Sequence, residues 1–349
     1  MTLAPLEASA YSLHRQSGRL TCEVAGIPGL REVLEPGLSL RSALTENGAV
    51  LIRGARLERR ENFEALLLGS SAFMPWSSYP FMERTRQKLG AVTVSSNYTR
   101  EGTARNGIFD FHQENSFLPR GFSPEWLAFC CVMPAMRGGE AGVINVADAL
   151  SALPATLQDK LDRSRTRHHV RMAAAEWEES YGTFAKDRLE QAAASHGARV
   201  KKATKGHVWL EFDRPYVESH RISGRRGLHY DRRHVWGTVF RSGAYRAAFA
   251  PHHVQHLADP VFARLRRPVI DLALKVSGRY RAEHLHLCAA EAEALALAWA
   301  DHLMAVPYQA GDLLLVDNVL TEHTALPWSG DRRLLVAMGD YHGRNDARS

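Results

Sequence analysis

Short runs of apolar residues, bounded by Gly, Pro and other turn formers, recur in the first part of the chain and again near its end. Runs of this length between turn residues are typical of strands in a β-rich core. The first 35 residues or so fit an irregular arm with short strands. The strands predicted from these runs cover residues 48–53, 91–95, 109–112, 125–132, 311–317 and 334–338.

Apolar residues at helical spacing predict helices before and between these strands. Two helices are expected early, at about 38–47 and 59–68, and the middle of the chain carries helical signals over about 147–194. Residues 261–280 and 289–305 also show helical spacing, and a polar, arginine-rich stretch lies at about 201–242.

Strands at both ends with helices between them predict one β core that is completed late in the chain. The expected fold is mainly β with a helical insert (α+β). Its layout matches a double-stranded β-helix, a cupin-like jelly roll, flanked by helices. We expect a single domain over residues 1–349, with a helical or lid insertion at about 150–305.

Composition narrows the class of protein. The chain has 349 residues, 45% of them hydrophobic and 23% charged, and a formal net charge of +6. The basic residues form only short clusters, and no zinc-finger, RNP or basic-zipper motif accompanies them, so we expect no nucleic-acid partner. The charge fits solvated surface arginines first, and anionic small substrates or an acidic carrier as alternatives.

The four cysteines, Cys22, Cys130, Cys131 and Cys288, form no C-x-x-C motif and no disulfide framework. The N-terminus lacks the pattern of a signal peptide, and no apolar run is long enough to span a bilayer. We therefore expect a cytoplasmic protein without membrane contact.

The strongest local signal for chemistry is the segment Phe109-Asp-Phe-His-Gln-Glu-Asn115. Residues two apart on a strand share a face, so His112 and Glu114 can direct an imidazole and a carboxylate at one point. These are two of the three ligands of a 2-His-1-carboxylate site for non-heme iron. The tripeptide H-x-E is common by chance, so this prediction depends on a third ligand elsewhere.

A second signal lies far downstream. A predicted buried strand leads into Asp317-Asn318, and His323 follows shortly after. Beyond a glycine-containing turn, the last strand opens with Arg332 and Arg333. A guanidinium that enters a β core is well matched to a carboxylate, which it can bind through two parallel hydrogen bonds.

Together these segments resemble the TauD/TfdA-like superfamily of iron- and 2-oxoglutarate-dependent dioxygenases, in the branch with the SyrP-like and clavaminate-synthase-like hydroxylases. The resemblance covers most of the chain from about residue 40 to 340. It rests on the two segments above and on the order of shorter motifs between them: His112–Phe117, Pro124–Ala135, Gly138–Glu140 and Ala147-Asp148.

The resemblance implies a role for each of these residues. His112, Glu114 and His323 would bind Fe(II). The arginine that binds 2-oxoglutarate would lie about ten residues past the distal histidine, where Arg333 fits the spacing best. Arg332 is the alternative, because a slip of one residue moves a side chain to the other face of a strand.

Two positions depart from the pattern of the family. Ala141 stands where many relatives carry a threonine whose hydroxyl helps to hold 2-oxoglutarate. Ala337 stands where taurine-type enzymes carry a second arginine, which makes a sulfonate substrate unexpected. Glu114 in turn argues against a halogenase, which would need Gly or Ala there to admit chloride.

The resemblance implies an oxygenase that uses Fe(II), 2-oxoglutarate and O₂, most simply to hydroxylate an amino acid or amino-acid-derived metabolite in natural-product biosynthesis. That small-molecule substrate would be free or bound to a carrier protein. The alternatives are a catabolic dioxygenase of small organic acids and a non-catalytic ligand-binding protein on the same fold. No hydrolase, P-loop or dinucleotide-binding motif supports another class of enzyme.

Further candidates are weaker. Residues 95–100 could line the pocket, and residues 211–236 could form a lid that bears Arg225, Arg226, Arg232 and Arg233. His252, His253 and His256 lack the carboxylate or cysteine that a second metal site would need.

Overall fold

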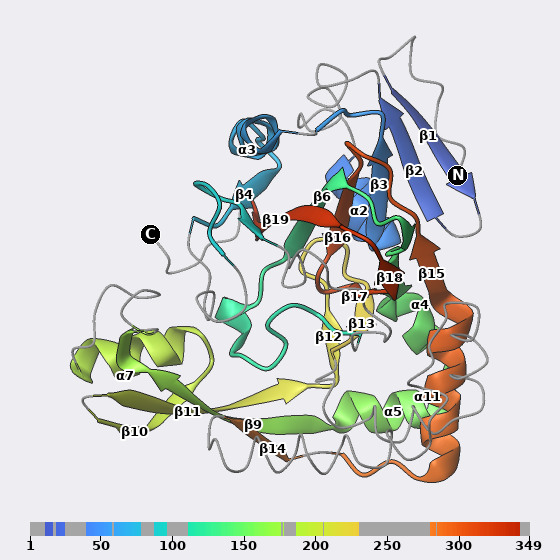
Figure 1. Ribbon diagram of the computed structural model, residues 1–349. Helices are drawn as coiled ribbons and strands as arrows, with labels where there is room; N and C mark the ends of the chain where they lie inside the picture. Colours follow the sequence, from blue (N-terminus) through green and yellow to red (C-terminus); the bar gives the residue numbers. More distant parts are fainter. Residues whose placement is uncertain are drawn as a thin grey trace.

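The computed structural model describes residues 11–16, 19–24, 40–57, 59–77, 87–95, 111–175, 177, 186–204, 206–229, 280–283 and 285–342. Within these ranges the chain is mostly β with few helices, as the apolar runs predicted (Figure 1). The double-stranded β-helix expected from the sequence stays a prediction.

The main sheet has eight strands and combines both ends of the chain. Its order is β1-β2-β3-β16-β6-β19-β4, with β5 on β19, and only β2 and β3 are paired in parallel. The apolar runs thus become the centre of one sheet. The strands are β1 (Tyr11–Gln16), β2 (Arg19–Val24), β3 (Ala49–Arg53), β4 (Phe73–Pro75), β5 (Val94–Ser95), β6 (Trp126–Met133), β16 (Leu313–Asp317) and β19 (Arg333–Tyr341).

A second, three-stranded sheet packs against the main sheet. It is formed by β15 (Leu303–Val306), β8 (Ala141–Asn145) and β17 (Thr321–Ala325), in that order. Nearby, β7 (Arg137–Gly138) pairs with β18 (Trp328–Ser329). An apolar cluster that we call the inter-sheet cluster joins the two sheets. Its buried members are Ala49, Leu51, Ala141, Val143, Val306, Leu314 and Val316.

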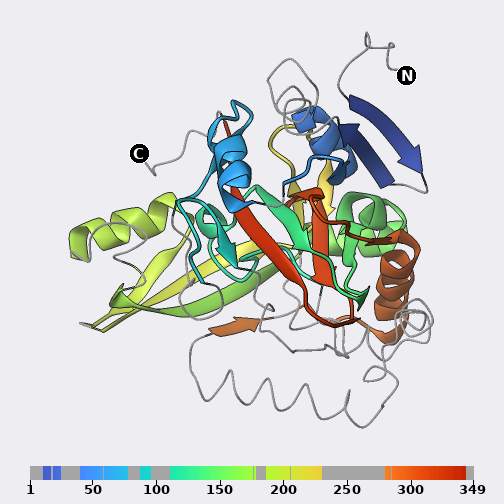
Figure 2. The ribbon, with the colours of Figure 1, turned by 45° about the horizontal axis from the view of Figure 1, so that its top comes forward.

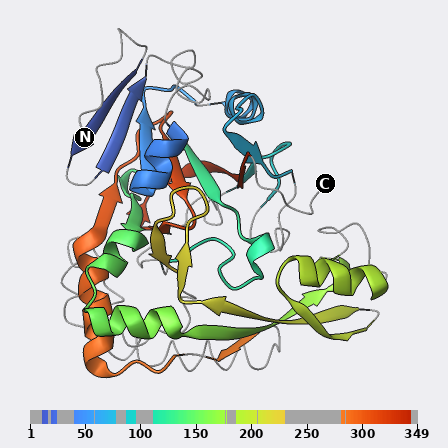
Figure 3. The ribbon, with the colours of Figure 1, turned by 180° about the vertical axis from the view of Figure 1, so that it is seen from behind.

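Helices cover the outer faces of both sheets. The helices α2 (Leu40–Asn47) and α3 (Arg60–Leu68) share a core cluster with the main sheet. The helices α4 (Val146–Ser151), α5 (Ala155–Arg163) and α11 (Ala289–His302) share another with the second sheet (Figure 3). None of the helices in the described ranges has the length and apolar character needed to cross a membrane.

The segment between β8 and β15 contains more strand than predicted. A four-stranded sheet, β10-β11-β9-β14, lies there with α7 (Lys186–Ser195) packed on one face (Figure 2). The helix expected through residues 165–173 is wrong, because this stretch is the strand β9 (Arg165–Ala173). The other strands are β10 (Arg199–Ala203), β11 (His207–Pro215) and β14 (Tyr280–Glu283). After β11 the chain forms a separate hairpin of β12 (Val217–Ser219) and β13 (Arg226–Leu228).

The sequence of β9 explains the error. Thr166, His168, Val170 and Met172 are buried, and the residues between them are mostly arginine. Two of the four inward positions are polar, so the alternation typical of a strand is hard to recognise. The helix predicted at 289–305 is confirmed as α11, and the one predicted at 261–280 lies outside the described residues.

Candidate metal centre

His112 and His323 lie on neighbouring backbone segments although they are far apart in the sequence. The N–H of His112 donates to the carbonyl of His323 at 3.2 Å, and the N–H of His323 donates back at 3.0 Å. This antiparallel bridge attaches the H-x-E segment to the edge of the second sheet beside β17. The backbone alone therefore brings the two predicted imidazoles together.

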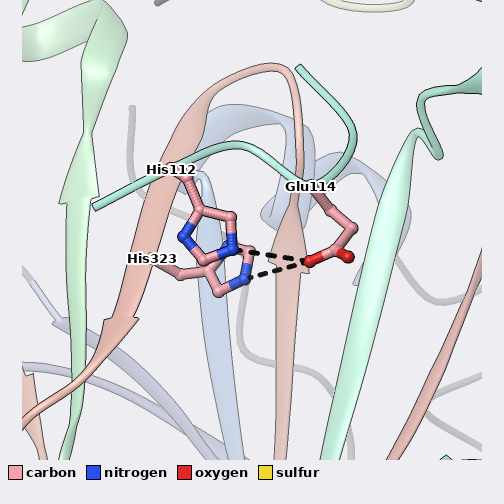
Figure 4. Close-up of side chains that lie close together, drawn as sticks. All are labelled: His112, Glu114 and His323. Atoms are coloured by element: carbon pink, nitrogen blue, oxygen red, sulfur yellow. Dashed lines mark ion pairs between the residues drawn. The ribbon is translucent and has the colours of Figure 1, made fainter. Parts of the chain in front are cut away.

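The side chains of His112, Glu114 and His323 converge on one point (Figure 4). The Nε2 atoms of His112 and His323 lie 3.5 and 3.9 Å from Oε2 of Glu114, and the ligand atoms of all three residues lie within 4.8 Å of one another. All three side chains are only slightly exposed. Two imidazoles and one carboxylate on a common face form the donor set of a non-heme iron site, so the residues fit this metal.

Asn318 fixes the backbone of Glu114. Its Oδ1 accepts the N–H of Glu114 at 2.7 Å, and its Nδ2 donates to the carbonyl of Glu114 at 3.0 Å and to that of Pro124 at 2.9 Å. Asn115, the residue after Glu114, has a φ of 57°, a left-handed conformation that asparagine tolerates better than most residues. The chain therefore turns sharply away from the site immediately after its carboxylate.

Asp317 shapes the turn from β16 to β17, which delivers His323. Its Oδ1 accepts the backbone N–H groups of Val319 and Leu320 at 2.9 and 2.8 Å. Its Oδ2 accepts the hydroxyl of Tyr341 at 2.9 Å and lies 3.0 Å from Nε2 of His220. Burial, with the neighbouring charge of Asp317, raises the pKa of Tyr341, which keeps this phenol protonated as a donor. The carboxylate is completely buried, and both of its oxygens have hydrogen-bond partners.

Arg214 connects the loop that follows Glu114 to the inserted sheet. Its guanidinium donates to Oε1 of Glu218 at 2.9 Å, to the carbonyl of Leu118 at 3.0 Å and to Nδ1 of His229 at 3.2 Å. Nε2 of His229 in turn donates to the carbonyl of Ser116 at 3.3 Å. The four-stranded sheet thus holds this loop by polar contacts as well as by apolar packing.

The ionisation of this network follows from its burial. Burial and the charge of Arg214 lower the pKa of His229 to about 4, so its imidazole is neutral at pH 7 and accepts from Arg214. Burial opposes ionisation of Glu218, but the surrounding cationic groups, Arg214 foremost, and the hydrogen bond from Arg214 together outweigh it and lower the pKa of Glu218 to about 2. Arg214, Glu218 and His229 all fall within the segment 211–236 that the sequence suggested as a lid, but no motif singled them out.

The structure distinguishes the two candidate arginines by burial. Arg332 is 8% exposed, whereas Arg333, the preferred candidate from spacing, is exposed at the start of β19. An irregularity in the pairing of β19 with β6 falls between Arg333 and Leu334. A bulge of this kind shifts the alternation of side chains, so spacing alone could not assign the faces.

Ala141 and Ala337, the two positions that depart from the residue pattern of the family, lie in the apolar interior. Ala141 is a buried member of the inter-sheet cluster and pairs with both Val306 and Ala325. Ala337 is fully buried in the cluster between the main sheet and its outer helices.

A polar cavity of about 700 Å³ reaches Glu114 from the side of the insertion. Carboxylates and guanidiniums line it in pairs: Arg214 with Glu218, and Arg221 with Glu125 at 2.9 Å. Its remaining lining includes Gln113, Arg120, His196, His229 and Asn318.

The weaker candidates are only partly described. Arg225 pairs with Asp148 at 2.6 Å and Arg226 pairs with Asp162, so both tie the β12–β13 hairpin to helices. Residues 96–100, Arg232, Arg233, His252, His253 and His256 lie outside the described residues.

Comparison with known proteins agrees with this geometry. The model of the family described as taurine catabolism dioxygenase TauD, TfdA family, matches residues 30–338. The dapdiamide synthesis protein DdaC of Enterobacter agglomerans is 22% identical over 311 residues, which cover 85% of this chain and 83% of that protein.

Solved structures share the fold. PvcB of Pseudomonas aeruginosa superposes with a TM-score of 0.52 at 13% identity, over 97% of this chain and 94% of that one. A taurine dioxygenase of Burkholderia xenovorans gives a TM-score of 0.52 at 16% identity, over 95% and 90% of the two chains. The chain belongs to the TauD/TfdA family and is an Fe(II)- and 2-oxoglutarate-dependent dioxygenase.

Proposed function

We propose that His112, Glu114 and His323 bind Fe(II) and that Arg332 binds the distal carboxylate of 2-oxoglutarate. The observation that carries the proposal is the convergence of two imidazoles and one carboxylate from segments far apart in the sequence. With iron, 2-oxoglutarate and O₂ bound, such a site supplies an oxidant strong enough to attack an unactivated C–H bond. The residues around it position the ligands and exclude water.

Burial supports Arg332 over Arg333. A guanidinium that is shielded from water binds a carboxylate more strongly than one at the surface, because less of the attraction is screened. Arg332 also lies beside Tyr308, which packs against the inter-sheet cluster. That position places Arg332 toward the space between the sheets.

We infer that the substrate is an amino acid or an amino-acid-derived metabolite and that the reaction belongs to natural-product biosynthesis. DdaC is named for dapdiamide synthesis, and PvcB is described as an oxygenase from an isonitrile synthetic pathway. The paired charges of the cavity beside Glu114 suit a substrate that carries both an ammonium and a carboxylate. Ala337 offers no second cation for a sulfonate.

A carrier-bound form of this substrate has separate support. One face of the sheet β10-β11-β9 bears more basic than acidic side chains. Arg165, Arg167, Arg199 and Lys201 lie there with Asp213 and Glu211, which pair with the last three of these cations. An acidic carrier protein would find charge complementarity there. We also propose that residues 1–349 form one oxygenase domain, with about 150–305 as an insertion that supports the site.

Anaerobic binding of Fe(II) and 2-oxoglutarate tests the metal centre. The wild-type protein should develop the weak visible charge-transfer band of a 2-oxoglutarate–iron complex, and His112→Ala or His323→Ala should abolish it. His302→Ala, which removes a partly buried histidine from α11, is the matched control and should retain the band. A band that survives both site substitutions would refute the ligand assignment. A substrate screen that follows succinate release would then identify the class of substrate.

A further inference from the structure

Tyr308 follows β15 and faces the space between the two sheets. Its ring packs on the inter-sheet cluster, as does Met304, which lies four residues earlier and so on the same face of an extended chain. Val306, between them on the same face, pairs directly with Ala141 on β8. Because residues two apart on an extended chain share a face, Tyr308 lies on the same side of the second sheet as Ala141.

The side chain of Arg332 lies against the ring of Tyr308. Its Cζ is 5.7 Å from the centroid of that ring and 5.0 Å from the centroid of Trp328. Two aromatic rings therefore flank this guanidinium.

The hydroxyl of Tyr308 has no hydrogen-bond partner among the residues that the structure describes. Burial raises the pKa of this phenol, and the positive charge of Arg332 opposes the rise only in part. The phenol is therefore protonated at neutral pH and can donate one hydrogen bond. A partly buried donor beside a guanidinium favours an anionic acceptor that contacts both groups.

We propose that the Tyr308 hydroxyl donates a hydrogen bond to the distal carboxylate of 2-oxoglutarate, beside the ion pair that this carboxylate forms with Arg332. A carboxylate has two oxygens and about four acceptor sites, so it can accept from a guanidinium and a phenol together. Ala141 contributes no hydroxyl to this part of the interior, and Tyr308 supplies one from just past the end of the neighbouring strand, β15. This inference rests on the proposed function, because it requires that Arg332 binds 2-oxoglutarate.

Binding of 2-oxoglutarate to the Fe(II) protein, measured anaerobically by calorimetry, tests the role of Tyr308 without turnover. Tyr308→Phe keeps the ring beside Arg332 and removes only the hydroxyl. We expect it to weaken 2-oxoglutarate binding roughly ten- to hundredfold, the range for a hydrogen bond to a charged group. Tyr216→Phe is the matched control, because the Tyr216 hydroxyl accepts the N–H of Leu285 in a different core cluster. It should leave the affinity within about twofold of wild type.

A second ligand locates the lost contact. The monoacid 2-oxopentanoate carries a methyl group where 2-oxoglutarate has its distal carboxylate, so Tyr308→Phe and wild type should bind it equally. Equal affinity of both proteins for 2-oxoglutarate would overturn the inference. So would an equal loss for both ligands, which would indicate a general disturbance of the site. If wild type itself fails to bind 2-oxoglutarate, the proposed function fails, and the two failures are thereby distinguished.

Discussion

Asn318 holds the main chain of Glu114 through both of its peptide groups, with its Oδ1 2.7 Å from the N–H and its Nδ2 3.0 Å from the carbonyl oxygen. The two residues are 204 positions apart in the sequence. Asn318 also follows Asp317, whose carboxylate orders the turn into the strand of His323. This dipeptide thus orders both the backbone of Glu114 and the turn that leads to His323.

We predict that Asn318→Ala weakens Fe(II) binding by roughly ten- to a hundredfold, the usual loss when a residue that orients a metal ligand is removed. The reason is that Glu114 would keep its carboxylate but lose the hydrogen bonds that direct its backbone. Anaerobic titration with Fe(II), read from the charge-transfer band, measures the effect.

Asn145→Ala is the control for this experiment. Asn145 is another buried asparagine, whose side chain caps α4 by accepting from Ala147 and Asp148. Its loss should lower the free energy of unfolding by about 1 kcal/mol and leave Fe(II) affinity unchanged. If Asn145→Ala weakened the metal site as much as Asn318→Ala, the orienting role of Asn318 would be refuted.

The two arginines at the start of β19 should behave differently. Arg332→Ala removes a buried guanidinium and should lower 2-oxoglutarate affinity by on the order of a hundredfold, the loss of a charge-assisted pair of hydrogen bonds. Arg333→Ala removes an exposed one and should change the affinity by less than about twofold. Calorimetric titration of the Fe(II) protein compares them, and the reverse order would show that Arg333 is the residue that faces the cosubstrate.

Much of the fold could be predicted because the central strands are buried on both faces. The runs that became β3, β6, β16 and β19 are almost wholly apolar, and turn residues bound them. Apolar runs this short, bounded by turn residues, favour buried strands over helices. In contrast, β9 carries arginines on its solvent side and polar residues among its buried ones, so composition concealed it.

The candidate site divides in the same way. Strand spacing predicted that His112 and Glu114 point together, but in the structure His112 forms an isolated bridge with His323 and Glu114 lies in a turn held by Asn318. The contacts of Asn318, Arg214 and Tyr308 are tertiary, and no spacing rule connects residues so distant in the chain. Sequence spacing left Arg332 and Arg333 as alternatives for a third reason, because a one-residue irregularity in β19 decides which side chain is buried.

His229 should make the stability of the protein depend on pH. Its folded pKa of about 4 lies below the usual 6.5, so between these values the unfolded chain binds a proton that the folded protein does not. The free energy of unfolding therefore falls as the pH drops from 6.5 toward 4. From pH 7 to pH 5 the loss from this residue is about 2 kcal/mol.

His229→Gln isolates this contribution, because glutamine can hydrogen-bond but does not titrate. Urea unfolding at pH 7 and pH 5 should show a smaller decrease for the variant than for wild type. An identical decrease in both proteins would mean that His229 titrates normally in the folded state.

The buried pair of Arg214 and Glu218 should be worth far more than an exposed pair on the same sheet. Arg214→Met leaves the buried Glu218 carboxylate with only the exposed Arg120 at 4.0 Å, which should cost about 3–5 kcal/mol of unfolding free energy. Arg167 and Asp213 form a similar pair, but the two side chains are 45% and 42% exposed. Arg167→Met should therefore cost less than about 1 kcal/mol.

The double variant Arg214→Met with Glu218→Gln separates pairing from packing. If the cost of Arg214→Met arises from the stranded carboxylate, neutralising Glu218 as well should recover part of the lost stability, as measured by urea unfolding. The loop that follows Glu114 would still lack the hydrogen bonds from Arg214 to Leu118 and Ser123. Fe(II) affinity should therefore stay reduced in the double variant even as stability returns. Recovery of both properties together would show that Arg214 supports the metal centre only by stabilising the fold.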